Sequence, residues 1–278
     1  MSLVSLLIVV IVIPLLIGVI SDSLGPVSRQ RVAKFARRQE LLVTADNGNA
    51  VIAYLATTRR WRATGLTAGF VTSVAWSFGN GFSINVVQLI AGWFAGALIA
   101  EWRISRLPVG ARRAASLEPR LLASYVSRTA RAVPLAFAGV SVVLVAVCAT
   151  VRASGHSLSM IKAGTFCALA LGLVAVGRVV QTRIVDRPQP LAALDVLAAD
   201  DAIRSRSLRV LIGAIGTLTA YCVVAQLDVL SGAAAHTGAY SNLRSCEVGI
   251  GLLGTFFGRA MGTSRWSVRR TDAAVPVS

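Results

Sequence analysis

The sequence predicts an all-α membrane protein with about seven transmembrane helices: an N-terminal anchor helix followed by three repeated helical hairpins. Three observations favour this fold class. Hydrophobic residues make up 55% of the chain and charged residues 14%, whereas soluble domains carry roughly 25% charged residues. The apolar residues gather in runs of membrane-spanning length, and the cations alternate between those runs. We therefore expect residues 1–262 to form a single transmembrane bundle.

The first apolar run covers residues 3–20 and contains no charged residue. A helix needs roughly 20 mainly apolar residues to cross the hydrocarbon core of a bilayer. Pro14 is its helix breaker. No cationic segment precedes the run and no small-residue cleavage site follows it, so we expect a retained anchor and not a cleaved signal.

Six further runs of mainly apolar residues follow along the chain. They cover about residues 64–78, 83–100, 133–151, 160–180, 208–227 and 244–261. The turn-forming Gly79-Asn80-Gly81 separates the first two. The last run is the least apolar, because Arg244, Glu247 and Arg259 lie in or beside it. Residues 263–278 are expected to form a basic, poorly ordered cytoplasmic tail.

The cations predict the orientation of the chain. Cytoplasmic loops of membrane proteins collect Lys and Arg. If the N-terminus lies outside, 25 of the 28 cations fall in cytoplasmic segments and only Arg152, Lys162 and Arg244 fall outside. This distribution predicts a cell-membrane protein with a cytoplasmic C-terminus. It also accounts for the net charge of +16 without a nucleic-acid partner.

Three stretches share one organisation, and together they suggest an internal repeat. Each has a mixed apolar and polar segment, then an arginine cluster, then two spans; the segments start at 50–54, 121–125 and 197–201. We expect these segments to form short amphipathic helices at the cytoplasmic interface. Repeats surround the substrate site in many transporter folds. Duplication of a hairpin with no transport role produces the same pattern, so both interpretations stay open.

The arginine clusters are candidate contacts to anionic lipid headgroups or to a partner protein, because each cation near a charged leaflet contributes about 1 kcal/mol. The candidates are Arg59, Arg60, Arg62, Arg128, Arg131, Arg204 and Arg206. The alternative is that they only follow the charge rule for cytoplasmic loops. On a helix, Arg204 would also pair with Asp200 or Asp201.

Four polar residues in the outer halves of the spans form a second candidate site. Polar groups in lipid are costly and often mark function. Asn85 and Gln88 share one helical face, and Glu247 follows Arg244 by one turn. One interpretation is an outward-facing polar pocket in which Glu247 titrates or binds a cation. The other is an Arg244–Glu247 ion pair with interhelical amide hydrogen bonds. Glu101, directly after a span, is expected at the cytoplasmic interface.

Signatures of enzymes and cofactors are missing from the sequence, so we expect neither catalysis nor a bound cofactor or metal. No phosphate-binding loop is present. The four cysteines lack metal-ligand spacing, and His156 and His236 lie in separate predicted loops. The glycines at 249, 251 and 254 match a dinucleotide-binding pattern, but that pattern works only between a strand and a helix. The cysteines are interpreted as small apolar packing residues.

Glycines spaced four apart allow helices to approach closely. Such pairs occur at Gly65/Gly69 and Gly92/Gly96, and a triplet occurs at 254, 258 and 262. Packing inside the bundle explains them. A homo-oligomer formed through these faces is the alternative.

Three strings, at 100–103, 111–120 and 197–204, resemble those of multi-pass membrane proteins of actinobacteria. They are Ala-Glu-Trp-Arg, Ala-Arg-Arg-Ala-Ala-Ser-Leu-Glu-Pro-Arg and Leu-Ala-Ala-Asp-Asp-Ala-Ile-Arg. The resemblance covers about the C-terminal two-thirds of the chain. It implies an inner-membrane location and brings no catalytic or binding residue with it.

Two hypotheses of function follow. The first is a permease-like protein or an accessory membrane subunit of a transport complex, which would need an ATPase or another membrane subunit for energy. The second is a non-transporting membrane scaffold or interaction protein that uses its cytoplasmic arginine segments.

Overall fold

The computed structural model describes residues 3–77, 85–106, 113–114, 122–155, 157–190, 193–233 and 239–264. These residues are almost entirely helical, which confirms the all-α prediction. The helices are α1 (Leu3–Leu24), α2 (Arg29–Gln39), α3 (Ala45–Ser77), α4 (Val86–Ser105), α5 (Leu122–Tyr125), α6 (Arg128–Ala153), α7 (Met160–Asp186), α8 (Leu194–Ala233) and α9 (Ala239–Thr263). The two-residue strands β1 (Arg113–Ala114) and β2 (Gln189–Pro190) pair antiparallel.

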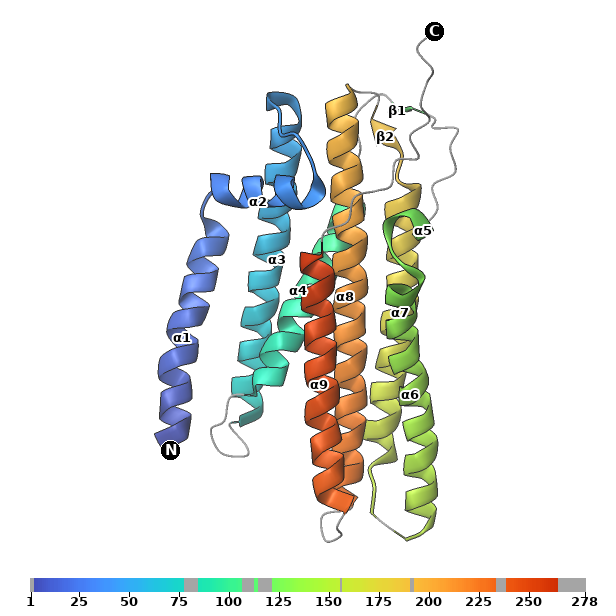
Figure 1. The fold of residues 1–278 in the computed structure, drawn as a ribbon. Coiled ribbons are helices and arrows are strands. Elements are labelled where there is room, and N and C mark those ends of the chain that lie inside the picture. The colour runs from blue at the N-terminus through green and yellow to red at the C-terminus, as the bar shows by residue number, and fades with distance from the viewer. Residues whose placement is uncertain are drawn as a thin grey trace.

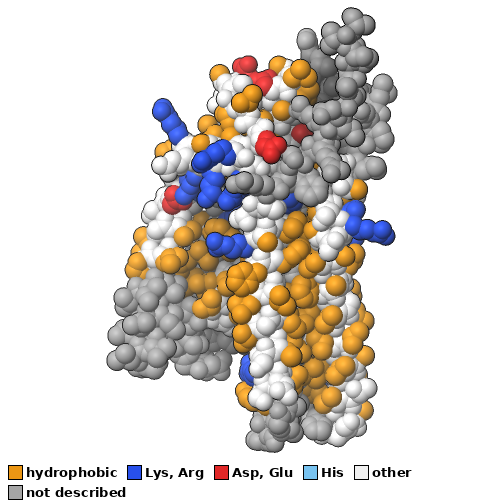
Figure 2. Space-filling model, in the orientation of Figure 1, with side chains coloured by type: hydrophobic (Ala, Val, Ile, Leu, Met, Phe, Trp, Pro, Cys, Tyr) orange, Lys and Arg blue, Asp and Glu red, His pale blue; other side chains and the backbone are white. Residues whose placement is uncertain are grey.

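The long helices lie side by side and alternate in direction, while α2 crosses near one end (Figure 1). At that end α1, α4, α7 and α9 finish and α3, α6 and α8 begin. We call it the arginine-rich end. Figure 2 shows Lys and Arg side chains gathered in a band there, whereas the surface along the rest of the helices is mainly apolar. Cations and apolar surface are thus separated along the bundle.

Helix α8 is the central element of the fold. The most apolar stretch of α8 is 83% buried, against 22% for the corresponding stretches of α6 and α7. It packs against α9, α7, α6 and α4, and its buried residues take part in all four hydrophobic clusters of the core. The outer faces of α6 and α7 stay apolar and exposed, as lipid-facing surfaces do.

Helices α3 and α4 approach closely through facing glycines. A methyl group at Gly65 would lie 2.8 Å from the Cα atom of Gly96, and one at Gly92 would lie 2.9 Å from the Cα atom of Gly69. Neither position has room for a side chain. Both glycine pairs therefore pack against each other within the chain, as the packing interpretation expects.

Helix α9 uses part of its glycine triplet in the same way. A methyl group at Gly254 would lie 2.6 Å from the Cβ atom of Ala220 on α8, and Gly258 lies against Thr217 and the ring of Phe94. Gly262 has no neighbour within 4 Å of such a methyl group. The triplet thus joins α9 to α8 and α4 over two of its three positions.

Among the described residues, three helices are both long enough and apolar enough to cross a membrane: α6, α7 and the 194–232 part of α8. Each of the seven predicted runs lies within a helix, apart from Asn85, which caps α4, and residues 78 and 83–84, which are outside the described residues. The predicted number of spans is supported only in part, because α3, α4 and α9 carry polar or charged residues along their lengths. Most of the predicted tail, 265–278, is also outside the described residues.

The predicted interfacial helices are wrong in two of three cases. Residues 50–54 continue into α3 and residues 197–201 continue into α8 without a break. No Pro or Gly separates these segments from their spans, so the helix propagates. At about 1.5 Å per residue, the 40-residue α8 is about 60 Å long and exceeds a bilayer core of about 30 Å. Only α5 is separate, because Ser127 starts α6 as its N-cap.

Candidate functional site at the arginine-rich end

A buried carboxylate, Glu101, lies at the arginine-rich end between α3, α4 and α8. Glu101 has no exposed surface, and its Oε1 accepts a hydrogen bond of 3.1 Å from the hydroxyl of Tyr54, which is 4% exposed. Its neighbours on the buried face of α4 are Ala97, Ala100 and Ile104. The side chain is buried within the protein at this level, because the apolar face of α4 continues past the end of the predicted span.

Burial raises the pKa of Glu101 above its usual value, and the Ser207 hydroxyl and the Arg62 guanidinium oppose only part of this shift. Burial and the nearby Glu101 also raise the pKa of Tyr54. Among the described residues, Oε2 of Glu101 has no hydrogen-bond partner. Since an unpaired buried charge is costly, the arrangement favours a carboxyl group that keeps its proton.

A second buried cluster joins the end of α7 to the start of α8. Asp200 forms ion pairs with Arg187 and with Arg204, the latter at 2.8 Å. Arg204 is 2% exposed and also donates to the carbonyl oxygens of Ile184 and Val185 at 3.3 and 3.2 Å. Its guanidinium thus satisfies carbonyls at the C-terminus of α7. The predicted pairing with Asp200 is confirmed. The predicted lipid or partner contact at Arg204 is wrong, because the side chain is enclosed.

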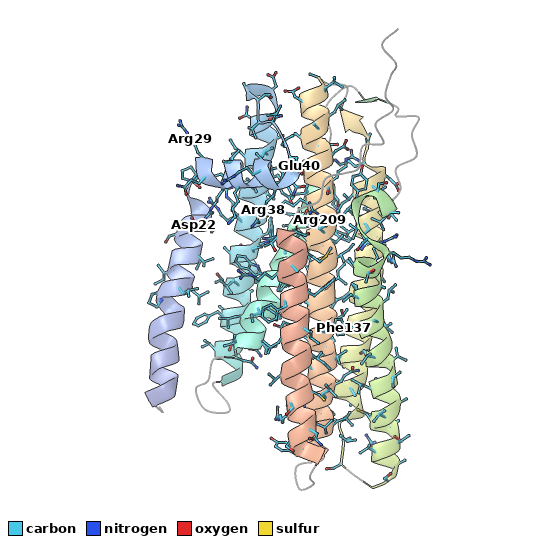
Figure 3. All side chains as sticks on the ribbon, in the orientation of Figure 1. Asp22, Arg29, Arg38, Glu40, Phe137 and Arg209 are labelled. Atoms are coloured by element: carbon cyan, nitrogen blue, oxygen red, sulfur yellow. The ribbon has the colours of Figure 1, made fainter. Side chains whose placement is uncertain are left out.

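Arg209, which is 3% exposed, holds three elements together. It donates to Gln39 Oε1 of α2 at 2.8 Å, to the carbonyl oxygen of Ser264 after α9 at 2.6 Å, and to the carbonyl oxygen of Ser205 in α8. Figure 3 shows Arg209 at the level of α2. This residue therefore acts in packing of the arginine-rich end.

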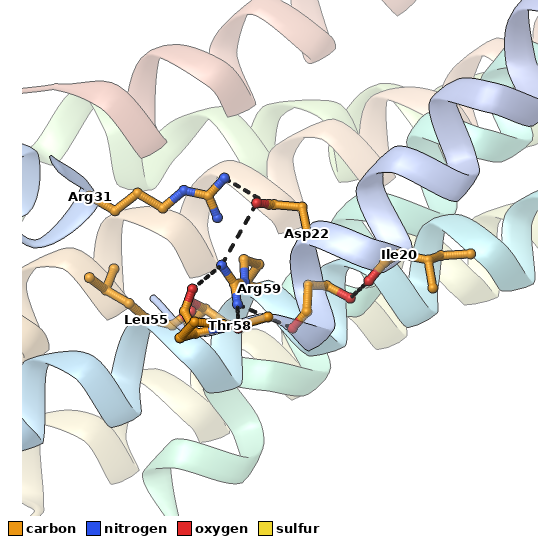
Figure 4. A network of polar contacts seen from close by, with 9 residues as sticks. Ile20, Asp22, Arg31, Leu55, Thr58 and Arg59 are labelled. Atoms are coloured by element: carbon orange, nitrogen blue, oxygen red, sulfur yellow. Dashed lines mark hydrogen bonds and ion pairs between the residues drawn. The ribbon is translucent and has the colours of Figure 1, made fainter. Parts of the chain in front are cut away.

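Arg59 holds the corner between α1 and α2. It donates to the carbonyl oxygens of Ser23 and Gly25, and it lies 4.0 Å from Asp22, which also pairs with Arg31 at 2.7 Å (Figure 4). Its side chain is 13% exposed. Most of its hydrogen-bonding capacity is used inside the protein, which leaves little for a lipid or a partner.

The other candidate arginines differ in exposure. Arg62, Arg131 and Arg206 are half-buried, whereas Arg60 and Arg128 are exposed. Arg62 lies over the ring of Trp93 and Arg206 over the ring of Phe35. Arg60 and Arg128 form no ion pair among the described residues. Of the seven candidates, these two keep the most freedom to meet an external anion.

Among the described residues, the only hydrogen bond or ion pair that joins two of the four outer polar residues is the one between Arg244 and Glu247. Asn85 caps α4 by accepting from the backbone N–H of Val87 at 3.0 Å. Arg244 pairs with Glu247 at 2.7 Å, as the second interpretation expects, and with Asp228 of α8 at 3.0 Å. In the described part of the chain no hydrogen bond or ion pair joins these groups to Gln88.

Polar groups along the apolar length of α8 bond inside the bundle. Gln226 accepts from the Ser141 hydroxyl at 2.7 Å and donates to the carbonyl oxygen of Ala163 at 3.0 Å. Thr217 donates to the carbonyl oxygen of Gly254 at 2.7 Å. These bonds join α8 to α6, α7 and α9. They have the character of helix-packing contacts in membranes.

The four cysteines are free thiols. Within the described ranges no three His, Cys, Asp or Glu side chains gather in a way that would hold a metal. His156 and His236 lie outside the described residues.

The residues that sequence reasoning missed are Tyr54, Ser207 and Arg209, together with the burial of Glu101. One signal was present: Glu101 continues the spacing of Ala97 and Ala100 on α4. The spatial proximity of these residues could not be predicted from the sequence, because they come from three helices.

In comparisons with protein-family models, with curated proteins and with solved structures, nothing matches this chain.

Proposed function

We propose that this protein is a seven-span protein of the cell membrane, with its N-terminus outside and its C-terminus in the cytoplasm, and that it acts as a non-transporting scaffold or interaction protein. Its working surface is the arginine-rich end. There it engages anionic lipid headgroups and a partner protein through exposed guanidinium groups.

One observation carries this proposal: several polar side chains within the apolar length bond to other groups of the bundle, whereas two exposed arginines at one end have no acidic partner among the described residues. Gln226 and Thr217 bond between helices, and Glu247 pairs with Arg244. Arg60 and Arg128, by contrast, are exposed and have no acidic partner in the described ranges. Unpaired surface cations attract anionic headgroups and acidic partners.

The orientation is supported by the charge distribution. The arginine-rich end collects the cations that the alternation of spans assigns to the cytoplasm, and Lys and Arg accumulate on that side of membranes. A C-terminal reporter that is active only outside the cell tests the orientation. We expect it to stay silent; an active reporter would exclude the seven-span topology.

The test of function is co-purification from native membranes in a mild detergent, followed by mass spectrometry. We compare the unmodified chain with an Arg60→Gln/Arg128→Gln variant and with an Asn85→Leu/Gln88→Leu variant. A scaffold should lose its bound partner in the arginine variant and keep it in the other. A partner lost only in the Asn85→Leu/Gln88→Leu variant would reject the proposal.

The second candidate is an accessory membrane subunit of a transport complex. It is favoured by three packed pairs of consecutive helices, α3–α4, α6–α7 and α8–α9, which resemble the repeated hairpins of transporter folds. A stoichiometric ATPase or transporter subunit in the same co-purification would select this candidate over a scaffold.

A further inference from the structure

A groove between α3 and α4 at the arginine-rich end combines cationic and aromatic walls. Its volume is about 750 Å³, which lies within the usual range of ligand sites. The residues with charged, aromatic or aliphatic side chains that line it are Arg60, Trp61, Ile99, Trp102, Arg103 and Arg106. Thr57 and Thr64 also line the groove, and with them the lining residues of each helix recur at spacings of three and four, so each helix contributes one face.

Two of the arginines are held in place by the tryptophans. The guanidinium carbon of Arg103 lies 4.7 Å from the ring centroid of Trp61, and that of Arg106 lies 4.6 Å from the ring centroid of Trp102. Stacking uses the face of a guanidinium and leaves its N–H edges free to donate. Neither side chain donates a hydrogen bond or joins an ion pair within the described residues.

Arg60 adds a third cation without a described partner. It is exposed. Thus three guanidinium groups line one groove, and no acidic side chain does. Like charges held this close repel each other, and a bound anion relieves that repulsion. Planar guanidinium forks are suited to phosphate oxygens in particular.

The position of the groove along the bundle points to the source of that phosphate. The lining residues of α3 lie before or at the start of the predicted span 64–78, and those of α4 surround the end of the predicted span 83–100. Tryptophans prefer this headgroup level. Ile99, at the same groove, is 43% exposed and offers apolar surface for an acyl chain.

We propose that the groove formed by Arg60, Arg103 and Arg106 with Trp61 and Trp102 is a binding site for the phosphate headgroup of an anionic membrane lipid. This inference rests on the proposed membrane placement. The proposed function involves a general attraction between exposed cations and anionic headgroups, and this inference adds a defined binding site for one lipid. The arginines bind the phosphate, and the tryptophans orient the arginines and contact the glycerol region.

The test measures retention of phosphatidylglycerol by the full chain. The protein is placed in phosphatidylcholine nanodiscs with increasing phosphatidylglycerol, and bound lipid is counted by native mass spectrometry. The groove variant is Arg103→Gln/Arg106→Gln. The control, Arg29→Gln/Arg37→Gln, removes the same charge from exposed arginines outside the groove. We expect the groove variant to lose about tenfold more affinity than the control. Equal losses would mean diffuse attraction and would overturn the site.

Two further arms complete the test. Millimolar inorganic phosphate should not displace the lipid; full displacement would identify a free-phosphate site and overturn the lipid assignment. If the double variant does not fold, Arg60→Gln is compared with Arg37→Gln, since the Arg60 side chain makes no described polar contact and Arg37 is exposed outside the groove. If the C-terminal reporter is silent and the groove variant retains as much lipid as the unmodified chain, only the groove is rejected. An active reporter rejects the proposed membrane placement itself.

Discussion

The hydroxyl of Tyr54 on α3 donates a hydrogen bond of 3.1 Å to Oε1 of Glu101 on α4, at a depth where the two side chains are 4% and 0% exposed. This bond satisfies one oxygen of a carboxyl group that has no access to water. It also joins α3 to α4 between their glycine contact and the arginine-rich end of the bundle. The arginine-rich end is therefore organised around a polar core, and its stability should depend on that core.

Replacing Tyr54 by Phe tests this bond. The substitution leaves Glu101 Oε1 without its donor in a buried site, so we expect a loss of about 1–3 kcal/mol in the free energy of unfolding. Denaturant unfolding of the detergent-solubilised protein measures it. Tyr240→Phe is the control, because Tyr240 is 37% exposed and should change stability by less than about 0.5 kcal/mol. Equal effects would mean that the Tyr54 bond contributes nothing specific.

The pH dependence of stability should carry the signature of Glu101. Its pKa is raised in the folded protein, so the folded state binds this proton more firmly than the unfolded state. The stabilisation is then complete below the ordinary pKa of 4.5 and is lost as the pH rises through the folded pKa.

Unfolding curves of the unmodified protein and of Glu101→Gln, from about pH 4 to about pH 8, reveal this contribution as a difference. We expect the unmodified chain to lose stability relative to the variant as the pH rises. Glu40→Gln, at an exposed carboxylate, is the charge-matched control. Parallel curves for Glu101→Gln and the unmodified chain would show that burial does not raise the pKa of Glu101.

A methyl group at Gly65 should disrupt the α3–α4 contact. It would lie 2.8 Å from the Cα atom of Gly96, and backbone cannot move aside as a side chain can. We expect Gly65→Ala to cost at least about 1–3 kcal/mol by overpacking. Gly164→Ala, in α7, has no neighbour within 4 Å and should be neutral or stabilise by about 0.5–1 kcal/mol. Thermal unfolding distinguishes the two, and a tolerated Gly65→Ala would contradict the close approach.

Gln226 should be the most sensitive polar residue of the apolar core among those that bond between helices. Gln226→Leu leaves the Ser141 hydroxyl and the Ala163 carbonyl without this partner. Interhelical bonds in membranes contribute about 0.6 kcal/mol on average and at most about 1.7 kcal/mol, so we expect a loss in that range. Thr219→Val is the control, since Thr219 bonds only within α8. A Gln226→Leu variant no less stable than the control would contradict this role.

Removal of Arg204 should be costly, because the buried Asp200 then keeps only Arg187 as an ion-pair partner and two carbonyl oxygens at the end of α7 lose their donor. We expect Arg204→Leu to destabilise the fold by about 3–5 kcal/mol, as for other broken buried pairs. Arg128→Leu, at an exposed arginine, should change stability by less than about 0.5 kcal/mol. Similar unfolding midpoints for the two variants would mean that Arg204 contributes no more to stability than an exposed arginine does.

The sequence predicted the helices better than the roles of their polar residues. The runs at 133–151 and 160–180 fall inside α6 and α7, which are long and apolar enough to span a membrane. The Arg244–Glu247 and Asp200–Arg204 pairs follow from helical spacing and were predicted. Such features are local: they depend on residues three or four positions apart and on the average polarity of a window.

The predicted outer pocket stays a prediction: Asn85 and Glu247 were grouped because both are polar residues in apolar runs, and no hydrogen bond or ion pair joins them in the described chain. The burial of Glu101 was not predicted, because α4 continues past the predicted span and the residue just after the span faces the protein interior.

What the sequence determined by itself is the helical class, the positions of the long helices and the separation of cations from apolar surface. What only the tertiary structure decided is which polar groups meet. Tyr54 and Glu101 are 47 positions apart, and Arg209 and Gln39 are 170 apart. A periodic pattern shows which face of a helix is apolar, but it does not show which helix covers that face. Burial of a polar group and the partner that satisfies it are set by packing between distant segments.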